Sequence, residues 1–152
     1  MTKRLVSLLV GFCLLLFVFL FLFQNYKNEA KKMDLPIEIE FKKLISGNSD
    51  ERLISIKPNG DFLNIVKYEG RDQFEVLSAG RVSEEDNSNL KRYIIIENDF
   101  FSIAKESMGG CSDPTTYFIS VKLGEVKHEV VSNCANDPDV VRIAEKIERL
   151  IN

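Results

Sequence analysis

The first 23 residues include an apolar run that is unlike the rest of the chain. From Leu5 to Phe23 there are 19 residues, and the only polar one is Ser7. At a helical rise of about 1.5 Å per residue, the run covers roughly 28 Å, close to the hydrocarbon thickness of a bilayer. A helix of this composition has no polar side, so lipid is its favoured environment. We therefore expect a tail over residues 1–4, a single transmembrane helix over residues 5–23 and a short polar stalk over residues 24–33.

A cleaved signal peptide is the alternative interpretation of this run. Signal peptides have a shorter apolar core, of about 7–15 residues, followed closely by small residues at the cleavage point. Here the first plausible small residue, Ala30, lies seven positions beyond Phe23, and Asn28 occupies the position two before it. These features favour an uncleaved anchor that holds the chain in the lipid bilayer.

The next part of the chain has the pattern of a strand meander. Apolar and polar residues alternate over residues 35–42, and apolar segments follow at residues 53–57, 62–68 and 74–80. The second and third of these strands flank Pro58, Asn59, Gly60 and Asp61. Asn-Gly at a tight reversal is a strong hairpin signal, and the expected turn has positive φ at both central positions. The pattern predicts a hairpin there.

A helix, a second hairpin and a last helix are predicted after the meander. Ser83 caps the first helix, whose inner side is expected to carry Leu90, Tyr93, Ile94 and Ile96. The second hairpin turns at Gly124-Glu125, which places Leu123 opposite Val126, Val121 opposite His128 and Ile119 opposite Val130. The last helix begins at the cap Asp137, has Pro138 in its first turn and carries an apolar stripe. Residues 34–152 thus predict one α+β domain, an antiparallel sheet with two helices packed on one face.

Charge argues against a nucleic-acid partner. The whole chain has 20 basic and 23 acidic residues. Five basic residues and one acidic residue precede Asp34, so residues 34–152 carry 15 basic and 22 acidic residues, a net charge of −7. An acidic domain repels the phosphate backbone that a nucleic-acid binder must attract.

Two cysteines decide the expected orientation, because the charges on either side of the apolar run are nearly balanced. Cys111 and Cys134 each lie in a polar, turn-rich loop, whereas free cysteines are usually buried like small hydrophobes. A disulfide between them would indicate an oxidising compartment. We therefore expect a single-pass protein of the cell membrane with its domain on the extracytoplasmic side. The alternative is two reduced, partly buried thiols in a cytoplasm-facing domain.

No catalytic or metal-binding motif is found. His128 is the only histidine and is expected on the covered sheet face, no Gly-x-Ser-x-Gly sequence is present, and Gly109-Gly110 lacks the sequel of a phosphate loop. A cluster of carboxylates at Glu84, Glu85 and Asp86 is explained by helix capping. Oxygen-bearing residues near the predicted disulfide do not follow the spacing of a calcium loop; they are Asp113, Asn133, Asn136, Asp137 and Asp139. No cofactor is expected, and the loop with Gly109, Gly110, Ser112 and Asp113 is the candidate binding loop.

Residues 53–152 resemble a family of small extracytoplasmic domains of unknown function found in bacterial lipoproteins and secreted proteins. The stretches that carry the resemblance are Ile56-Lys57-Pro58-Asn59-Gly60-Asp61, Tyr68-Glu69-Gly70, Gly80-Arg81-Val82-Ser83-Glu84-Glu85, Asp99-Phe100-Phe101-Ser102-Ile103 and Ser112-Asp113-Pro114-Thr115-Thr116. Members often carry a Cys-Pro-containing loop before the first hairpin, which this sequence lacks. The resemblance implies an α+β fold outside the cytoplasmic membrane and, since no activity is attached to the family, nothing about catalysis.

These observations lead to three functional hypotheses. The first is a membrane-anchored, noncatalytic binding or assembly module of the cell envelope, with another envelope protein as its partner. The second is an envelope hydrolase with an unrecognised site, for which a pocket joining His128 to a serine or carboxylate would be required. The third is an inhibitor or ligand-sensing module that presents the loop over residues 109–114.

Overall fold

A computed structural model of the chain describes residues 2–45, 50–107 and 115–152, with side chains described from Cys13 onward except that of Ser107. The chain divides into two compact units, one up to Asp34 and one over Leu35–Asn152. Each unit is described by itself.

The first unit is a single helix. Helix α1 (Thr2–Asp34) runs without a break through the residues predicted as a stalk, and the apolar side chains from Leu14 to Phe23 are exposed. Among the helices of the described residues, none combines the length and apolar character needed to cross a membrane. The predicted transmembrane segment over residues 5–23 is therefore not confirmed.

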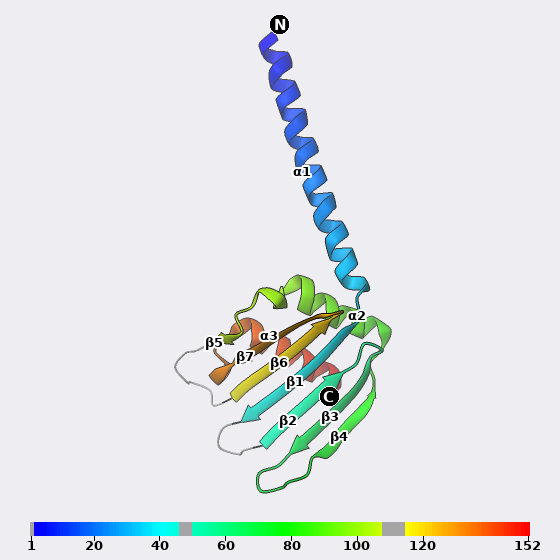
Figure 1. The fold of residues 1–152 in the computed structure, drawn as a ribbon, viewed down its shortest axis with the longest axis vertical. Helices are drawn as coiled ribbons and strands as arrows, with labels where there is room; N and C mark the ends of the chain where they lie inside the picture. The colour runs from blue at the N-terminus through cyan, green and yellow to red at the C-terminus, as the bar shows by residue number, and fades with distance from the viewer. Residues whose placement is uncertain (1, 46–49, 108–114) are drawn as a thin grey trace. The chain divides into compact units, whose positions relative to one another are not determined.

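The second unit is built on a sheet with a long strand at its centre (Figure 1). The described residues form seven strands in the order β4-β3-β2-β1-β6-β7-β5. They are β1 (Ile37–Ile45), β2 (Asp50–Ile56), β3 (Asp61–Lys67), β4 (Glu75–Arg81), β5 (Glu106–Ser107), β6 (Thr115–Leu123) and β7 (Val126–Ser132). All neighbours pair antiparallel except the short β5, which runs parallel to β7. The predicted antiparallel sheet of an α+β domain is confirmed.

Both predicted hairpins form, but the first turn differs from the expectation. The β6–β7 register is the predicted one, with Val121 opposite His128. In the β2–β3 turn only Gly60 has positive φ, at 83°, and its N–H donates to the carbonyl of Lys57 at 2.9 Å. The prediction of positive φ at both central positions was wrong. Pro58 fixes its own φ near −65°, which suits the first position of a type I turn that ends in a left-handed glycine.

Short capped helices connect and cover the strands. They are α2 (Glu84–Arg92), the π-helical turn η1 (Tyr93–Glu97), the 3-10 turns η2 (Phe100–Ser102) and η3 (Asn133–Ala135), and α3 (Pro138–Ile151). The predicted caps are confirmed. The Ser83 side chain accepts the Asp86 N–H at 3.1 Å, and Asp137 accepts two N–H groups at the start of α3.

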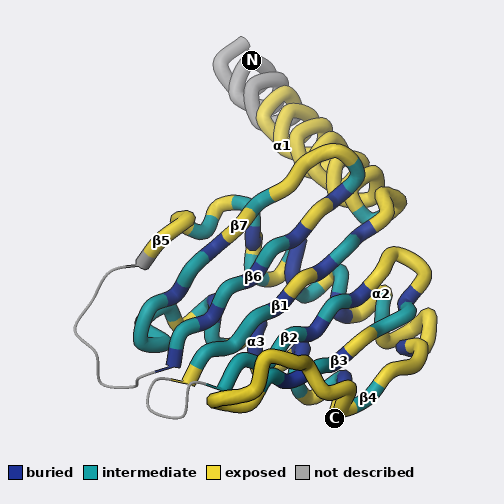
Figure 2. Tube along the Cα trace, turned by 60° about the horizontal axis from the view of Figure 1, so that its bottom comes forward, coloured by how far each residue is buried: buried dark blue, intermediate teal, exposed yellow. Residues whose placement is uncertain are grey.

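The hydrophobic core lies on one side of the sheet only. Buried positions alternate along β1 and β6, as the dark blue segments of Figure 2 show. These strand residues form one cluster with Leu90 of α2, Ile94 of η1 and the apolar stripe of α3, which includes Ile143 and Ile147. Each such aliphatic side chain stabilises the fold by about 1.5–3 kcal/mol through burial. We call the side of the sheet under these helices the covered face and the other side the open face.

Candidate binding surface on the open face of the sheet

The loop predicted to bind a ligand lies outside the described residues. Gly109, Gly110, Cys111, Ser112 and Asp113 all belong to it. The predicted disulfide between Cys111 and Cys134 therefore stays a prediction.

Cys134 is the one cysteine of the predicted disulfide that lies within the described residues, and it occupies a strained turn. Cys134 and Ala135 have φ values of 60° and 50°, in the left-handed region. In this region a residue with a Cβ is disfavoured by about 1–2 kcal/mol. The described chain stops at Ser107, which pairs with Ser132 at the end of β7, and resumes at Thr115 on β6. Cys134 thus follows β7 at the end of the sheet where both ends of the loop lie.

His128 is a structural side chain, as its position in the hairpin predicted. Its ring is half-buried on the covered face, and its Nε2 lies 2.9 Å from the carbonyl oxygen of Ile103. A carbonyl only accepts, so Nε2 carries the proton. The rings of Phe100 and Phe101 lie 5.4 and 5.8 Å from the imidazole, centroid to centroid. The hydrogen bond and the aromatic contacts hold the imidazole in place on the covered face.

The carboxylates considered for acid–base chemistry serve as capping groups. Glu84, Glu85 and Asp86 are exposed in the first turn of α2, where Asp86 also accepts the Ser83 hydroxyl at 2.7 Å. Within the described ranges, no three His, Cys, Asp or Glu side chains gather closely enough to hold a metal ion.

The open face carries a hollow of about 490 Å³ that was not predicted from the sequence. No helix of the second unit covers it, since α2 and α3 contribute to the core of the opposite face. The hollow is lined by side chains from five neighbouring strands, β3, β2, β1, β6 and β7. Those that project from the open face are Glu40, Lys42, Leu53, Ser55, Leu63, Ile65, Phe118, Ser120, Glu129 and Val131.

Cross-strand register orders the floor of the hollow into two adjacent rows. The apolar row contains Ile65, Leu53, Lys42, Phe118 and Val131, paired strand to strand. Side chains paired in this way lie about 4.5–5.5 Å apart at Cβ, so they form a continuous surface. The four apolar members are half-buried even though no helix of the second unit covers them.

Lys42 does not present an unpaired charge in the middle of the apolar row. Its Nζ lies 2.6 Å from Oε1 of Glu51 and 5.7 Å from the centre of the Phe118 ring. The ion pair and the cation–π contact together hold the ammonium group to one side. The methylene stem of Lys42 then continues the apolar surface between Leu53 and Phe118.

The second row is polar, and we call it the Glu40 row. It contains Leu63, Ser55, Glu40, Ser120 and Glu129 in register. Glu129 is paired with Lys127 at 2.7 Å, and this hydrogen-bonded cation lowers the pKa of the Glu129 carboxyl group. Glu40, by contrast, is exposed and makes no hydrogen bond or close ion pair with any described residue. Lys127 attracts it electrostatically but forms its ion pair with Glu129.

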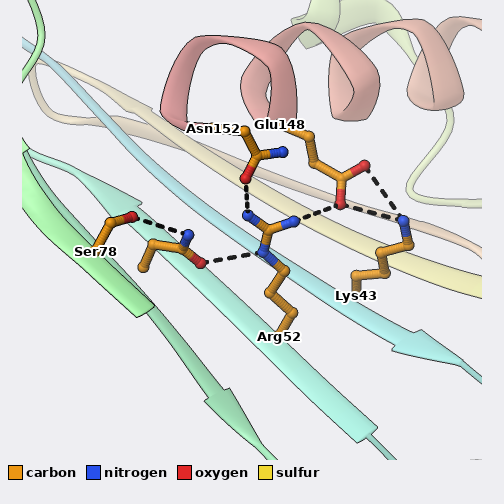
Figure 3. A network of polar contacts seen from close by, with 6 residues as sticks. Lys43, Arg52, Ser78, Glu148 and Asn152 are labelled. Atoms are coloured by element: carbon orange, nitrogen blue, oxygen red, sulfur yellow. Dashed lines mark hydrogen bonds and ion pairs between the residues drawn. The ribbon is translucent and has the colours of Figure 1, made fainter. Parts of the chain in front are cut away.

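A polar cluster on the covered face fastens the end of α3 to the sheet (Figure 3). The carboxylate of Glu148 accepts hydrogen bonds from Lys43 Nζ at 3.1 and 3.2 Å and from Arg52 Nη1 at 3.3 Å. Arg52 also donates to Asn152 Oδ1 at 2.6 Å and to Asn64 Oδ1 at 3.0 Å. Because Glu148 meets both cations, the cluster is a structural clamp rather than an open site; we call it the Glu148 clamp.

The chain matches no protein-family model, and no curated protein is significantly similar to it.

Sequence reasoning missed the hollow although a signal for it exists. Residues 62–66 of β3 are apolar except for Asn64, and a strand with one wet face would alternate. A continuous apolar run indicates that both faces of a strand meet apolar surroundings. The Glu148 clamp leaves no comparable signal, since its members lie far apart along the chain.

Proposed function

We propose that this protein is a membrane-anchored, noncatalytic binding module of the cell envelope, and that the open face of its sheet is the binding surface. The hollow is the observation that carries this proposal. Apolar side chains on an uncovered sheet face are unfavourable in water, at about 25 cal/mol per Å² of exposed apolar area, unless something else covers them. A partner seated in the hollow would bury them.

The anchoring part of the proposal rests on the apolar run and on the cysteines. Nineteen residues with one polar member favour lipid over water on every side of a helix. A bridge between Cys111 and Cys134 would require the domain to fold in an oxidising compartment. Alkylation of the full chain without reductant, read by mass spectrometry, tests the bridge: we expect label on Cys13 alone. Label on all three cysteines would contradict it.

Location is tested in intact cells. We expect the full chain to stay with membranes after alkaline carbonate extraction, and added protease to digest the domain without opening the cells. Release of the uncut chain by carbonate would contradict the anchor. Protection from protease until the cells are opened would contradict the orientation.

The binding surface is tested by site-specific photo-crosslinking of the full chain in its native membranes. p-Benzoylphenylalanine in place of Ser120 stands on the open face beside Glu40. The same group in place of Glu145 stands on the exposed side of α3 and is the matched control. We expect a discrete crosslinked product from position 120 that position 145 does not give. Equal crosslinking from both positions, or none from either, would argue against the open face as the binding surface.

A further inference from the structure

We propose that the hollow receives a polypeptide segment that presents one lysine or arginine between apolar side chains, with the cation paired to Glu40. This inference rests on the proposed function, in that it takes the open face as the binding surface and names what that surface recognises.

The charges around the hollow point to a single cation. Lys42 is neutralised by Glu51, and Glu129 is neutralised by Lys127. Glu40 makes no hydrogen bond or close ion pair among the described residues, and the cation that acts on it electrostatically, Lys127, is held by Glu129. Glu40 projects from β1, the middle one of the five strands that line the hollow. A cation bound at the centre of the hollow would therefore meet this carboxylate first.

The neighbours of Glu40 suit a cationic head on an apolar body. Ser55 and Ser120 are its cross-strand neighbours on either side, and their hydroxyl oxygens can accept further hydrogen bonds from an ammonium or guanidinium group. One row away, Leu53 and Phe118 flank Lys42 and supply apolar contact. Lysine and arginine carry methylene stems below the charge, so one such side chain can use both rows.

The extent of the hollow favours a peptide segment over a free small cation. Its lining residues come from five adjacent strands, and four spacings of about 4.8 Å give a length of roughly 19 Å. An extended chain covers that distance with about six residues. The net charge of −7 on residues 34–152 attracts a basic partner over longer distances.

The test uses the full chain in phosphatidylcholine nanodiscs and fluorescein-labelled peptides of the sequence Gly-Ser-Leu-Val-X-Leu-Val-Ser-Gly. X is lysine, glutamine or glutamate, and binding is followed by fluorescence anisotropy against empty nanodiscs. We expect the lysine peptide to bind about fivefold more tightly than the glutamine peptide, an effect typical of one ion pair in partial contact with water. The glutamate peptide should bind more weakly than either.

Two substitutions separate the charge from the apolar surface. Glu40→Gln should abolish the preference for lysine over glutamine. The matched control is Glu38→Gln, which changes a carboxylate opposite Lys122 in the next row and should leave the preference intact. Double replacement Leu53→Ser with Phe118→Ser should weaken binding of all three peptides. A tyrosine-fluorescence urea titration of each variant confirms that the domain is folded.

The possible outcomes distinguish the two proposals. Equal affinity for the lysine and glutamine peptides overturns the inference about the cation, and so does an unchanged preference in Glu40→Gln. Displacement of the lysine peptide by an equal concentration of lysinamide overturns the inference that a segment is required. If no peptide binds while position 120 still crosslinks to a partner in membranes, this inference fails and the proposed function stands. If the crosslink is absent as well, both fail.

Discussion

The Glu148 clamp makes a quantitative prediction about stability. Replacing Glu148 by glutamine keeps the shape of the side chain but removes the charge that Lys43 and Arg52 share. The side chains of Glu148, Lys43 and Arg52 are 16%, 22% and 21% exposed, so most of each is shielded from water. Two cations would then face each other across a neutral amide on the covered face. We therefore expect Glu148→Gln to lower the free energy of unfolding.

The magnitude follows from the contacts that are lost. A hydrogen bond to a charged group contributes about 1.5–3 kcal/mol, and removing one partner of a fully buried ion pair costs about 3–5 kcal/mol. The three side chains are partly exposed, so the cost of removing the ion-pair partner is smaller here than in a fully buried pair. We expect a loss of about 2 kcal/mol for Glu148→Gln. In Lys43→Met the loss should be smaller, because Arg52 still holds the carboxylate.

A urea titration followed by tyrosine fluorescence measures this effect. The chain has four tyrosines and no tryptophan. Tyr117 is buried with its ring 6.0 Å from that of Phe41, so its emission should report on the core. The matched control is Glu145→Gln on the same helix, which breaks an exposed pair with Arg149 and should change stability by less than about 0.5 kcal/mol. A loss for Glu148→Gln no larger than that of the control would refute the clamp.

Three further predictions concern the turn, the cap and the paired charges. Gly60→Ala should destabilise the domain by roughly 1 kcal/mol more than Gly70→Ala in the same titration. Both glycines have positive φ, but only at Gly60 would an added Cβ meet a backbone oxygen, at 3.0 Å. Equal losses of stability would show that this contact relaxes freely. Ser83→Ala should cost about 1 kcal/mol by removing the α2 cap, and an unchanged midpoint would contradict the cap. Lys127→Met should raise the pKa of Glu129 towards its ordinary value, because the lysine stabilises the ionised form. With the lysine present, the carboxylate therefore stays ionised to lower pH. A carbonyl ¹³C NMR titration in which the pKa of Glu129 does not rise would contradict this prediction.

Local patterns predicted the second hairpin and the capped helices because contacts between residues close together in the chain form these elements. The β6–β7 register follows from apolar alternation about a short turn, and a one-residue slip of β7 against β6 would turn Val130 away from the covered face, where Val121 stays. The caps at Ser83 and Asp137 are contacts within three residues of chain. Such contacts depend little on the rest of the fold.

The π-helical turn η1 buries one residue that the helical pattern did not predict. Ile96 packs against the core as expected, but Ile95 was not predicted on the inner side. The π-helical turn η1 inserts one extra residue per turn, and Ile95 is buried at 3% exposure beside Ile94. Nothing in the residue pattern marks where such a turn begins.

The candidate binding surface depends on strand order, which local patterns do not reveal. Glu40 adjoins Ser120, and Leu53 and Phe118 flank Lys42, only because β1 lies between β2 and β6. Pairing of β1 with β6 joins residues far apart in the chain, and alternation alone does not choose the partner of a strand. The sequence therefore predicted the existence of an open face without the residues that meet on it.

The central place of β1 has a consequence for how the protein is made. Its partner β2 follows within a few residues, but β6 is synthesised about 80 residues after β1. The edge of β1 that later pairs with β6 therefore stays unpaired during much of translation. The nascent β1–β4 meander therefore exposes one row of unmatched backbone amides and carbonyls until the C-terminal third leaves the ribosome. Chains truncated before Thr115 should retain the unpaired edge of β1 and aggregate, whereas in the completed polypeptide the β6–β7 hairpin pairs with that edge.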